Sequence, residues 1–500
     1  MADYDVIVIG GGIAGLAVGG LMSKDGRKTI VLEQNERIGG FCSTFEHKGY
    51  RFDVGTSIIE MEHVIDQFFK RMGTSLSKEV DLIPIDPVYT YLLNDGTEVR
   101  YPVPNKAVVE EFKKLSPEDA RGWIKYAEDM EDFFSGVIPA YFYSPMLTFG
   151  DMFGMFIKQP KLLKYRSLFS TSYQMVMDNY FKHPVIREIL SFQGTFMGMP
   201  PALVPGVFSI LPWNEHNDFY YSKGGLIAIP EAILRVSKKA GMEFRTEALV
   251  KKVIVKNKRA CGVILSDGTE ITAKVVVSDI SAKALYTDLI GLEHLGPIAR
   301  RGVKSLKNSP SALMFFLGLD AAPPLKSHHT ILTATPEEFD LFFDQMLIEK
   351  RLPDRQAGLI SWKTYSDPGL APKGHHAIVM TLFGNYHLAG TDWDRIKDQL
   401  TEEYVDYFTR RYLPGMKDHV KVAMLGTPRD FERDLLAPEG GIYLLPNDMG
   451  HSAVFRPSAK SKGIEGLYLV GASTHPGGGV PTVICSAIIA DELIKKHEQN

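Results

Sequence analysis

At 500 residues, the chain exceeds the size that one hydrophobic core usually organises, so its length predicts at least two lobes. With 45% hydrophobic residues, 23% charged residues and a formal net charge of -4, the composition excludes both intrinsic disorder and a basic surface for nucleic acid. The three cysteines lie far apart, without a C-x-x-C pair or a metal-ligand spacing, which excludes a disulfide scaffold, a zinc site and a redox dithiol.

The first residues favour a cytoplasmic location. The sequence MADYDVIVIG enters a predicted strand almost at once, which leaves no room for the charged, apolar and cleavable parts of a secretory signal. No window of the sequence supplies the ~20 uninterrupted apolar residues that a transmembrane helix needs. We therefore expect a cytoplasmic protein, for which contact with a membrane would be peripheral.

The first predicted element is a short buried strand over residues 5–9, and the glycine-rich stretch 10–15 follows it. This stretch, GGGIAG, is a G-x-G-x-x-G motif at a strand-to-helix turn. Its three glycines permit a tight turn, close approach to a pyrophosphate and close packing of the next helix. Free amides at the helix start attract phosphates. The motif predicts a dinucleotide site that contains Gly10, Gly12, Ile13, Ala14 and Gly15.

A small-residue helix over residues 16–22 and a strand over residues 29–32 complete a βαβ unit. Glu33 follows this strand, 18 residues after Gly15. At about this spacing a carboxylate accepts hydrogen bonds from the adenosine ribose, so we assign Glu33 and its neighbour Gln34 to the dinucleotide site. The alternative is a glycine-rich loop in an unrelated α/β fold, which the strand, helix and acid in this order argue against.

Two later stretches decide between FAD and NAD through a resemblance. Residues 36–40, ERIGG, resemble the R-x-G-G segment of the phytoene desaturase and amine oxidase group of flavoproteins, in which the paired glycines lie against the FAD pyrophosphate. Residues 49–55, GYRFDVG, resemble that group's G-[FY]-x-F-D-x-G stretch. If Gly39-Gly40 were only a turn, the second stretch would stay unexplained. The resemblance implies non-covalent FAD, with Arg37, Gly39, Gly40, Asp53 and Gly55 near it.

The middle of the chain predicts a helix and a β-meander. Lys223-Gly224-Gly225 precedes a helix over about 230–239, and Asp267-Gly268 is a strong hairpin signal. The predicted strands cover residues 248–255, 260–265 and 270–277. In the resembling family this region rejoins the FAD domain, and its first strand places a valine backbone against adenine. That role carries over to Val250, which would otherwise be a plain core residue.

The last predicted unit is a strand over 467–470, a glycine-rich loop and a helix over 482–495. The sequence GLYLVGASTHPGGGVPTV resembles the C-terminal signature of phytoene desaturases, which completes the flavin site. Its helix N-terminus, aimed at the flavin, would stabilise the negative charge of reduced flavin. The resemblance assigns to the cofactor Gly471, Ala472, Gly479 and Val480. His475 is the candidate to hydrogen-bond the flavin or relay a proton, and it would otherwise fix the loop.

The predicted fold class is α/β. We expect a Rossmann-type FAD-binding domain, built from a parallel sheet and a β-meander, together with a discontinuous α+β substrate domain. The expected division gives the FAD domain residues 1–95, 220–290 and 436–500, and the substrate domain residues 96–219 and 291–435. Both domains are therefore assembled from separate stretches of the chain.

The resemblance to the family of phytoene desaturases, carotenoid isomerases and retinol saturases implies an enzyme acting on carbon-carbon bonds of a long apolar isoprenoid. A carotenoid desaturase with hydride transfer to flavin N5 is the first expectation. Phe41-Cys42 stands where desaturases commonly carry an arginine, so a polyene saturase and a cis-trans isomerase stay open. An amine oxidase is more remote because residues 472–481 carry no aromatic side chain. We find no Ser-His-Asp arrangement, carboxylate pair or metal cluster in the sequence.

The expected partners follow from the same reasoning. The substrate is a lipophilic polyene or isoprenoid, and the absence of a second G-x-G-x-x-G at a strand-helix turn predicts a diffusible electron acceptor, oxygen or a quinone. The aromatic stretch 133–156 is either a membrane-facing element or the core of the substrate lobe. The basic residues that would meet lipid headgroups are Lys158, Lys161, Lys164 and Arg166. No nucleic-acid partner is expected.

Overall fold

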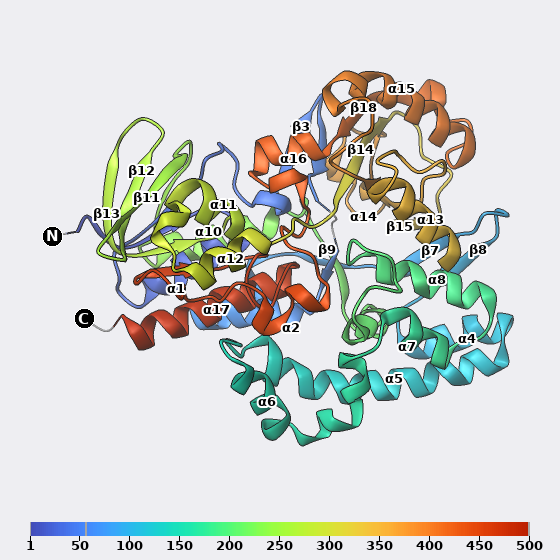
Figure 1. The fold of residues 1–500 in the computed structure, drawn as a ribbon. Coiled ribbons are helices and arrows are strands. Elements are labelled where there is room, and N and C mark those ends of the chain that lie inside the picture. The colour runs from blue at the N-terminus through green and yellow to red at the C-terminus, as the bar shows by residue number, and fades with distance from the viewer. Residues whose placement is uncertain (1, 56–57, 499–500) are drawn as a thin grey trace.

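A seven-stranded sheet at the N-terminal side carries the predicted βαβ unit in the computed structural model, which describes residues 2–55 and 58–498 (Figure 1). Parallel pairing joins β10, β2, β1, β13 and β19, and antiparallel pairing continues from β13 through β12 to β11. The strands are β1 (Tyr4–Ile9), β2 (Thr29–Leu32), β10 (Glu243–Arg245), β11 (Val250–Lys256), β12 (Arg259–Leu265), β13 (Glu270–Ser278) and β19 (Leu467–Leu469). The predicted parallel sheet with a β-meander is confirmed.

The continuous apolar run of β1 is explained by cover on both faces of this sheet. Val6 and Val8 pack in the core of α1 (Ile13–Lys24), α10 (Ala228–Lys239) and α17 (Val480–His497). Ile7 and Ile9 belong to a second core with residues of the meander. A strand buried on both faces needs apolar side chains at every position rather than at alternate ones. Helices α1 and α17 lie side by side although they come from opposite ends of the chain (Figure 1).

A second seven-stranded sheet forms the other β-layer. Its strands, in spatial order, are β18 (Val420–Gly426), β14 (Ser311–Leu319), β17 (His376–Gly384), β16 (Gly358–Trp362), β15 (His329–Leu332), β7 (Tyr89–Leu92) and β8 (Glu98–Tyr101). Strand β14 is buried along its whole length, because α15 (Trp393–Arg411) covers one face and β4 (Tyr50–Asp53) the other. Phe316 of β14 packs against Phe52 at 5.6 Å between ring centroids.

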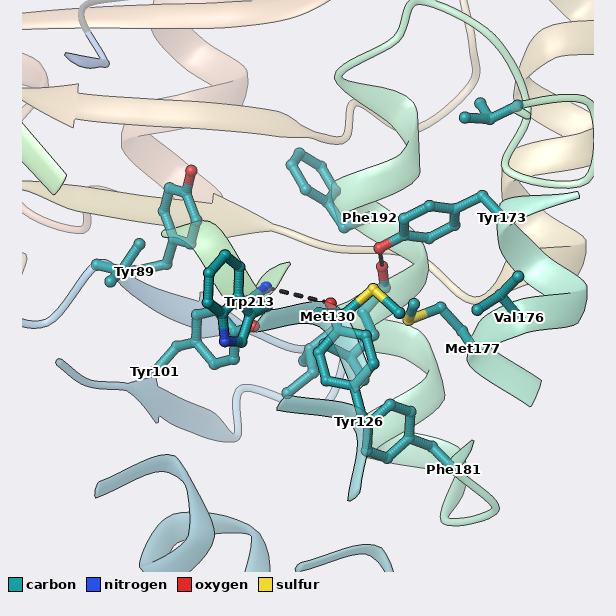
Figure 2. Packing of buried hydrophobic residues seen from close by; sticks show 14 of the residues in the cluster. Tyr89, Tyr101, Tyr126, Met130, Tyr173, Val176, Met177, Phe181, Phe192 and Trp213 are labelled. Atoms are coloured by element: carbon teal, nitrogen blue, oxygen red, sulfur yellow. Dashed lines mark hydrogen bonds between the residues drawn. The ribbon is translucent and has the colours of Figure 1, made fainter. Parts of the chain in front are cut away.

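A helical lobe packs below this sheet (Figure 1). It comprises α4 (Asn105–Leu115), α5 (Pro117–Val137), α6 (Phe149–Lys158), α7 (Tyr173–Tyr180), α8 (Pro184–Thr195) and α9 (Leu211–Asn214). Its core is rich in buried tyrosines, and Figure 2 shows hydrogen bonds of two of their hydroxyl groups, those of Tyr126 and Tyr173. The Trp213 amide donates to the Tyr126 hydroxyl at 3.1 Å, and the Tyr173 hydroxyl donates to the Leu190 carbonyl at 2.6 Å. Paired hydroxyls let aromatic side chains fill a core without a desolvation cost.

Short elements connect the layers. The three-stranded sheet β5-β9-β6 runs between the first sheet and the helical lobe, and a hairpin of β3 and β4 lies beside it. The remaining bounds are β3 (Thr44–His47), β5 (Ile59–Glu60), β6 (Leu82–Pro84), β9 (Phe219–Ser222), α2 (Glu62–Met72), α3 (Leu76–Glu79), α11 (Ala282–Ala284), α12 (Pro297–Ser305), α13 (Pro336–Leu347), α14 (Lys363–Ser366) and α16 (Pro428–Leu435). Within the described ranges, no helix has both the length and the hydropathy that crossing a bilayer requires.

We propose the five-segment division into an FAD domain and a substrate domain, with two boundaries moved from the expected positions. Strand β7, at residues 89–92, pairs with β15 in the second sheet, which puts the first boundary before it and not after residue 95. Val303 of α12 is buried in the core of the β-meander, which puts the third boundary after α12 and not after residue 290. Pairing and burial across the fold, which no local pattern encodes, account for both shifts.

Candidate functional site

A cavity of about 800 Å³ lies between the glycine loops of the first sheet and the apolar side chains of the helical lobe. Its volume is near the upper end of the roughly 300–1,000 Å³ found for ligand pockets. The predicted cofactor residues that line it are Gly10, Gly12, Ile13, Ala14, Glu33, Gln34, Gly39, Gly40, Gly55, Val250, Ala472, Gly479 and Val480. The structure therefore brings together residues from both ends and the middle of the chain.

The β1–α1 turn has no room for side chains at its glycines. A Cβ atom at Gly12 would lie 2.5 Å from the Asp279 carboxylate, and one at Gly15 would lie 2.1 Å from the Gly10 carbonyl oxygen. Gly15 does not line the cavity, so its role is the close packing of α1 against the strand. The first amides of α1 have no acceptor within the helix, and at Ile13 and Ala14 they belong to the cavity wall. This backbone cradle suits a pyrophosphate.

Glu33 stands at the end of β2, where the sequence predicts the ribose acceptor. Its carboxylate accepts hydrogen bonds from the amides of Gly11 at 2.7 Å and Asn35 at 2.8 Å. Burial raises the pKa of Glu33, and these backbone amides oppose the shift. Two fixed donors orient the carboxylate, which lines the cavity beside the glycine turn. The geometry fits an acceptor for ribose hydroxyls.

Asp279 is a site residue that the sequence reading missed. It directly follows β13, which pairs in parallel with β1 so that Ser278 lies opposite Ile9. Its carboxylate accepts a hydrogen bond from the Gly15 amide at 2.8 Å. Burial raises the pKa of Asp279 to about 7. The sequence does contain a sign of this residue, because an acid directly after a strand that pairs in parallel with β1 lies beside the glycine turn that follows β1.

Gly39 and Gly40 form a turn that packs against the first glycine-rich loop. The Gly39 amide donates to the Gly11 carbonyl at 2.9 Å, and Gly39 has a φ of +97°, a conformation that side chains disfavour. Arg37 lies outside the cavity wall, with its guanidinium 5.9 Å from the centroid of the Phe45 ring. Of this segment, Gly39 and Gly40 thus face the cavity.

Asp53 acts behind the cavity wall rather than in it. Its buried carboxylate accepts hydrogen bonds from the Thr44 hydroxyl at 2.7 Å and the Leu226 amide at 2.8 Å. It also forms an ion pair with Lys363 at 3.4 Å. Asp53 therefore connects the hairpin of β3 and β4 to the loop before α10. It does not line the cavity, so we expect it to support the cofactor site through these neighbouring segments.

The C-terminal loop forms the next part of the wall. Ala472, Gly479 and Val480 line the cavity, and α17 begins at Val480 with Pro481 in its first turn, as predicted. Arg456 donates to the Ala472 carbonyl through Nη2 at 2.6 Å, and burial lowers its pKa to about 10. Gly471 does not line the cavity, and a Cβ atom at this position would lie 2.1 Å from the Asp279 carboxylate. The close approach of the Gly471 backbone to Asp279 therefore requires a residue without a side chain.

His475 is placed in the second layer behind this loop. Its Nε2 atom lies 2.9 Å from the Tyr141 carbonyl oxygen, and its ring contacts the Tyr141 ring at 4.6 Å between centroids. Burial lowers the pKa of His475 to about 4, so the imidazole is neutral at pH 7. His475 does not line the cavity, although its neighbours Ala472 and Pro476 do. Its role in flavin contact or proton transfer stays a prediction.

Two buried glutamates also line the cavity, and the sequence reading missed them as a pair. Glu215 Oε1 accepts a hydrogen bond from the Tyr89 hydroxyl at 2.9 Å, and Glu60 accepts one from the Asn214 side chain at 2.7 Å. Burial raises the pKa of Glu60 to about 7 and that of Glu215 well above its ordinary value. The two residues are 155 positions apart, so no local spacing predicts their meeting.

The apolar wall is made of side chains from many separate elements. They are Ile58, Phe133, Phe134, Val137, Phe142, Met152, Met155, Phe156, Phe169, Phe196, Met197, Val207, Phe208, Ile210 and Leu211. Such a surface favours a hydrocarbon ligand over a charged one. The described part of the chain contains no cluster of His, Cys, Asp or Glu suited to a metal ion.

The donor set of the opposite wall fits FAD. A pyrophosphate needs amides and the absence of Cβ atoms, which the Gly10–Gly12 turn and the start of α1 supply. A ribose needs a carboxylate, which Glu33 supplies, and Val250 lines the cavity beyond it with 5% of its surface exposed. The start of α17 offers a helix N-terminus for the flavin end.

Comparison with known proteins agrees with this geometry. The family of flavin containing amine oxidoreductases matches residues 13–494. A 4,4'-diapophytoene desaturase (4,4'-diapolycopene-forming) of Methylomonas sp is 27% identical over 497 residues, covering 98% of this chain and 95% of the relative. A phytoene desaturase (neurosporene-forming) of Rhodobacter capsulatus is 27% identical over 495 residues, covering 98% and 93%.

Solved structures share the fold. Cyclohexylamine oxidase from Brevibacterium oxydans matches with a TM-score of 0.60 at 16% identity, covering 99% of this chain and 100% of that one. An oxidoreductase from Methanosarcina mazei matches with a TM-score of 0.63 at 16% identity, covering 98% and 100%. The family match covers nearly the whole sequence and both walls of the cavity. The chain therefore belongs to the flavin containing amine oxidoreductase family and is an FAD-dependent oxidoreductase.

Proposed function

We propose that this enzyme desaturates carbon-carbon bonds of a long apolar isoprenoid, with a phytoene-type carotenoid as its substrate. The observation that carries the proposal is the single cavity in which the glycine wall of the FAD domain faces aromatic and aliphatic side chains. Relatives named as phytoene and diapophytoene desaturases align with almost the whole chain, which supports the same substrate class.

In this proposal the protein positions the reactants and excludes water. Bound FAD supplies a hydride acceptor, its N5 atom, for the bond being oxidised. The backbone of the first loop, Glu33 and Val250 hold the cofactor, while the apolar wall binds the polyene. A hydrocarbon offers no hydrogen-bonding groups, so its position depends on shape and on apolar contact along the cavity.

The direct test is anaerobic mixing of the purified flavoprotein with phytoene and, separately, with diapophytoene. We expect loss of the oxidised-flavin absorbance and a product with one further double bond on chromatography. A primary amine is tested in parallel, because the family also contains amine oxidases. Bleaching by an amine and by neither polyene would contradict the proposed substrate class.

A saturase or isomerase is the second candidate, and Phe41 favours it. Desaturases that resemble this chain commonly carry an arginine at this place, whereas Phe41 lines the cavity and contacts Phe431 at 5.8 Å between ring centroids. Either activity needs a flavin that is reduced before the substrate reacts. Incubating chemically reduced enzyme with a cis polyene and, separately, with the all-trans isomer tests both: a saturated product supports a saturase, and conversion of the cis to the all-trans isomer supports an isomerase.

We further propose that electrons leave the flavin to a diffusible acceptor, oxygen or a quinone. The N-terminal G-x-G-x-x-G is used by FAD, and the sequence carries no other such motif at a strand-helix turn. Excess NADH or NADPH under anaerobic conditions should then leave the oxidised-flavin band intact on the turnover timescale. Rapid bleaching by either nucleotide would move the assignment to a reductase or a reduced-flavin isomerase.

We propose a cytoplasmic protein that binds the membrane peripherally through α6. Residues Phe149, Phe153 and Ile157 follow one another at four-residue intervals and are 54%, 64% and 79% exposed. On the same helix Met152, Met155 and Phe156 line the cavity. Figure 1 shows α6 at the outer edge of the helical lobe. A lipophilic substrate would thus pass directly between bilayer and cavity.

Both readings of the stretch 133–156 are combined in this arrangement. Phe133 is buried in the lobe core, as the core reading expects, whereas α6 presents its apolar side chains outward. Two of the expected headgroup contacts are engaged elsewhere: Lys161 pairs with Asp132 at 3.7 Å and Lys164 with Asp129 at 3.2 Å. The membrane contact we propose is therefore mainly apolar.

Liposome co-sedimentation at low and high salt tests the membrane contact. Wild type should bind neutral vesicles at both salt concentrations, because apolar insertion is not screened. The double substitution of Phe153→Ser and Ile157→Ser should abolish binding while preserving FAD content, since neither residue lines the cavity. Ile298→Ser is the control, as Ile298 is 90% exposed on α12. Equal binding by all three proteins would contradict α6 as the contact.

A further inference from the structure

The carboxyl pair of Glu60 and Glu215 is the least expected feature of the cavity. Both side chains line a cavity whose wall is otherwise largely apolar. Glu215 is only 1% exposed, and among residues 2–55 and 58–498 its Oε2 atom accepts no hydrogen bond of ordinary length, although the Gln193 side chain lies near enough to lower its pKa. A buried, unpartnered carboxylate oxygen is costly, so natural proteins keep one mainly where it serves a purpose.

Among the residues that the structure describes, no cation contributes to the charges that shift the pKa values of this pair. The charges that shift the two pKa values are those of the pair itself and of Asp218, and every one of them is acidic. The tyrosines near the pair and the imidazoles of His216 and His329 are neutral at pH 7, because burial raises the pKa of the tyrosines and lowers that of the two histidines. These tyrosines are Tyr89, Tyr91, Tyr101, Tyr126 and Tyr173.

Two like charges in a dry cavity disfavour double ionisation, so the pair retains a proton near neutral pH. One oxygen then remains negative and able to accept a proton, while the other carboxyl is already protonated. The hydrogen bonds from Tyr89 and Asn214 fix the two side chains in place. Glu60 has the lower pKa of the two and ionises first, and a carboxylate held beside apolar surface is chemically suited to take a proton from a hydrocarbon.

We propose that the Glu60–Glu215 pair is the catalytic base that removes the proton during desaturation. The inference rests on the proposed function. One C–H bond of the substrate breaks and its electron pair leaves as hydride, which the oxidised cofactor of this enzyme takes up. The C–H bond on the neighbouring carbon breaks next, its electrons form the new C=C bond, and the proton passes to the carboxylate pair. Atoms and electrons balance without a further reactant.

The other candidates for this proton are placed less well. His475 lies behind the loop, neutral and hydrogen-bonded to the Tyr141 carbonyl, and it does not line the cavity. Asp279 lines the cavity at the glycine turn, where its carboxylate is bonded to the Gly15 amide in the cradle for the pyrophosphate. The glutamate pair alone combines an acid group with the apolar wall.

The test compares Glu215→Gln, Glu60→Gln and the double substitution with wild type. The matched control is Glu188→Gln, because burial also raises the pKa of Glu188 to about 7 but this residue does not line the cavity. FAD content, read from the flavin absorbance, should be equal in all five proteins. Anaerobic flavin reduction by the polyene should slow by roughly 10-fold in each single variant and by roughly 100-fold or more in the double variant.

Two further readouts separate a base from a structural residue. The wild-type rate of flavin reduction should rise with pH and level off as the pair loses a proton, and the double variant should lose this dependence. Infrared spectra of protein labelled with ¹³C-glutamate should show protonated-carboxyl absorbance near pH 7, to which Glu188 also contributes, and Glu215→Gln should lose a part of it that Glu188→Gln retains. Should the glutamine variants fail to fold, Tyr89→Phe removes one hydrogen bond that favours the ionised form, so its pH profile should shift upward.

The outcomes distinguish the inference from the proposed function. If the polyene reduces wild-type flavin and the double variant keeps the same rate and pH profile, the base assignment is overturned alone. Protonated-carboxyl absorbance that is the same in wild type and in Glu215→Gln would overturn it as well. If no polyene reduces the wild-type flavin at all, the proposed function fails and the inference fails with it.

Discussion

The two walls of the cavity are built in opposite ways. The cofactor wall combines backbone turns with a few side chains such as Glu33 and Val250, and its turns need glycine because a Cβ atom at Gly12 or Gly15 would overlap existing atoms. The substrate wall consists of side chains from the helical lobe, such as Phe134, Met152 and Phe208, which come from different elements. The glycine turns of the cofactor wall leave no room for side chains, whereas the substrate wall is made mainly of side chains.

This difference between the walls predicts which property of the enzyme a substitution in each wall should change. A backbone cradle fails abruptly, because a single misplaced atom blocks the phosphate, whereas a wall of many apolar side chains loses contact area gradually. The first wall should therefore respond in cofactor content and the second in substrate kinetics. Four predictions follow the contrast from the largest expected effect to the smallest.

Gly12→Val should give folded protein with almost no FAD. The new side chain would enter the space between the turn and Asp279, where the pyrophosphate has to approach. Glu33→Ala, which removes the ribose acceptor, should deplete FAD as well. Flavin absorbance per protein and circular dichroism measure the two quantities. Gly302→Ala is the control because nothing lies within 4 Å of a Cβ atom there; full FAD in Gly12→Val would refute the cofactor assignment.

Phe208→Ala should leave FAD content unchanged and lower kcat/KM for the polyene by about 5- to 50-fold. The substitution removes one of many apolar side chains, and losses of this kind are worth roughly 1–3 kcal/mol. Steady-state kinetics with chromatographic detection provide the measurement. Leu341→Ala, at a position that is 50% exposed, is the comparison variant. Loss of flavin from Phe208→Ala would show that the two walls are not independent.

Asp279→Asn should flatten the pH dependence of FAD binding. Burial raises the pKa of Asp279 to about 7, so the wild-type carboxyl loses its proton as the pH rises through this value. Its negative charge then opposes the pyrophosphate, and wild type should bind FAD less tightly at pH 8 than at pH 6. Quenching of FAD fluorescence during titration of apoprotein measures the change. Equal pH dependence in both proteins would exclude Asp279 from the cradle.

Glu60→Gln should raise stability at pH 8 by on the order of 2 kcal/mol and leave it nearly unchanged at pH 4. The pKa of Glu60 is raised to about 7 in the folded protein, so its stabilising contribution is present below the unfolded pKa of 4.5 and is lost as the pH rises toward 7. Glutamine can still accept the hydrogen bond from Asn214. Urea midpoints at both pH values provide the measurement; a lower midpoint at pH 8 would contradict the burial argument.

The sequence predicted the cofactor wall far better than the substrate wall. Gly10–Gly15, Glu33 and the loop before α17 are recognisable because phosphate and ribose impose a fixed spacing on a βαβ unit. Asp53 and Arg37 stand in the recognised motifs but contact other parts of the protein, because a motif records which residues co-occur and not which atom touches the ligand.

The substrate wall escaped prediction because its residues meet only through tertiary packing. Glu60 and Glu215 are brought together by the pairing of β5 with β9 and by the Asn214 hydrogen bond. The exposed face of α6 shows a four-residue period in the sequence, yet the same period is typical of a buried helix. Only the arrangement of the lobes tells which face is covered.

The strand order of the first sheet also determines when its strands can pair during translation. Strands β1 and β2 leave the ribosome first, but β13 must follow before β1 gains its second neighbour, and β19 pairs with β13 only near residue 467. The α17 N-terminus, which completes the flavin end, is translated later still. The nascent chain therefore lacks part of the cavity wall until α17 has been translated.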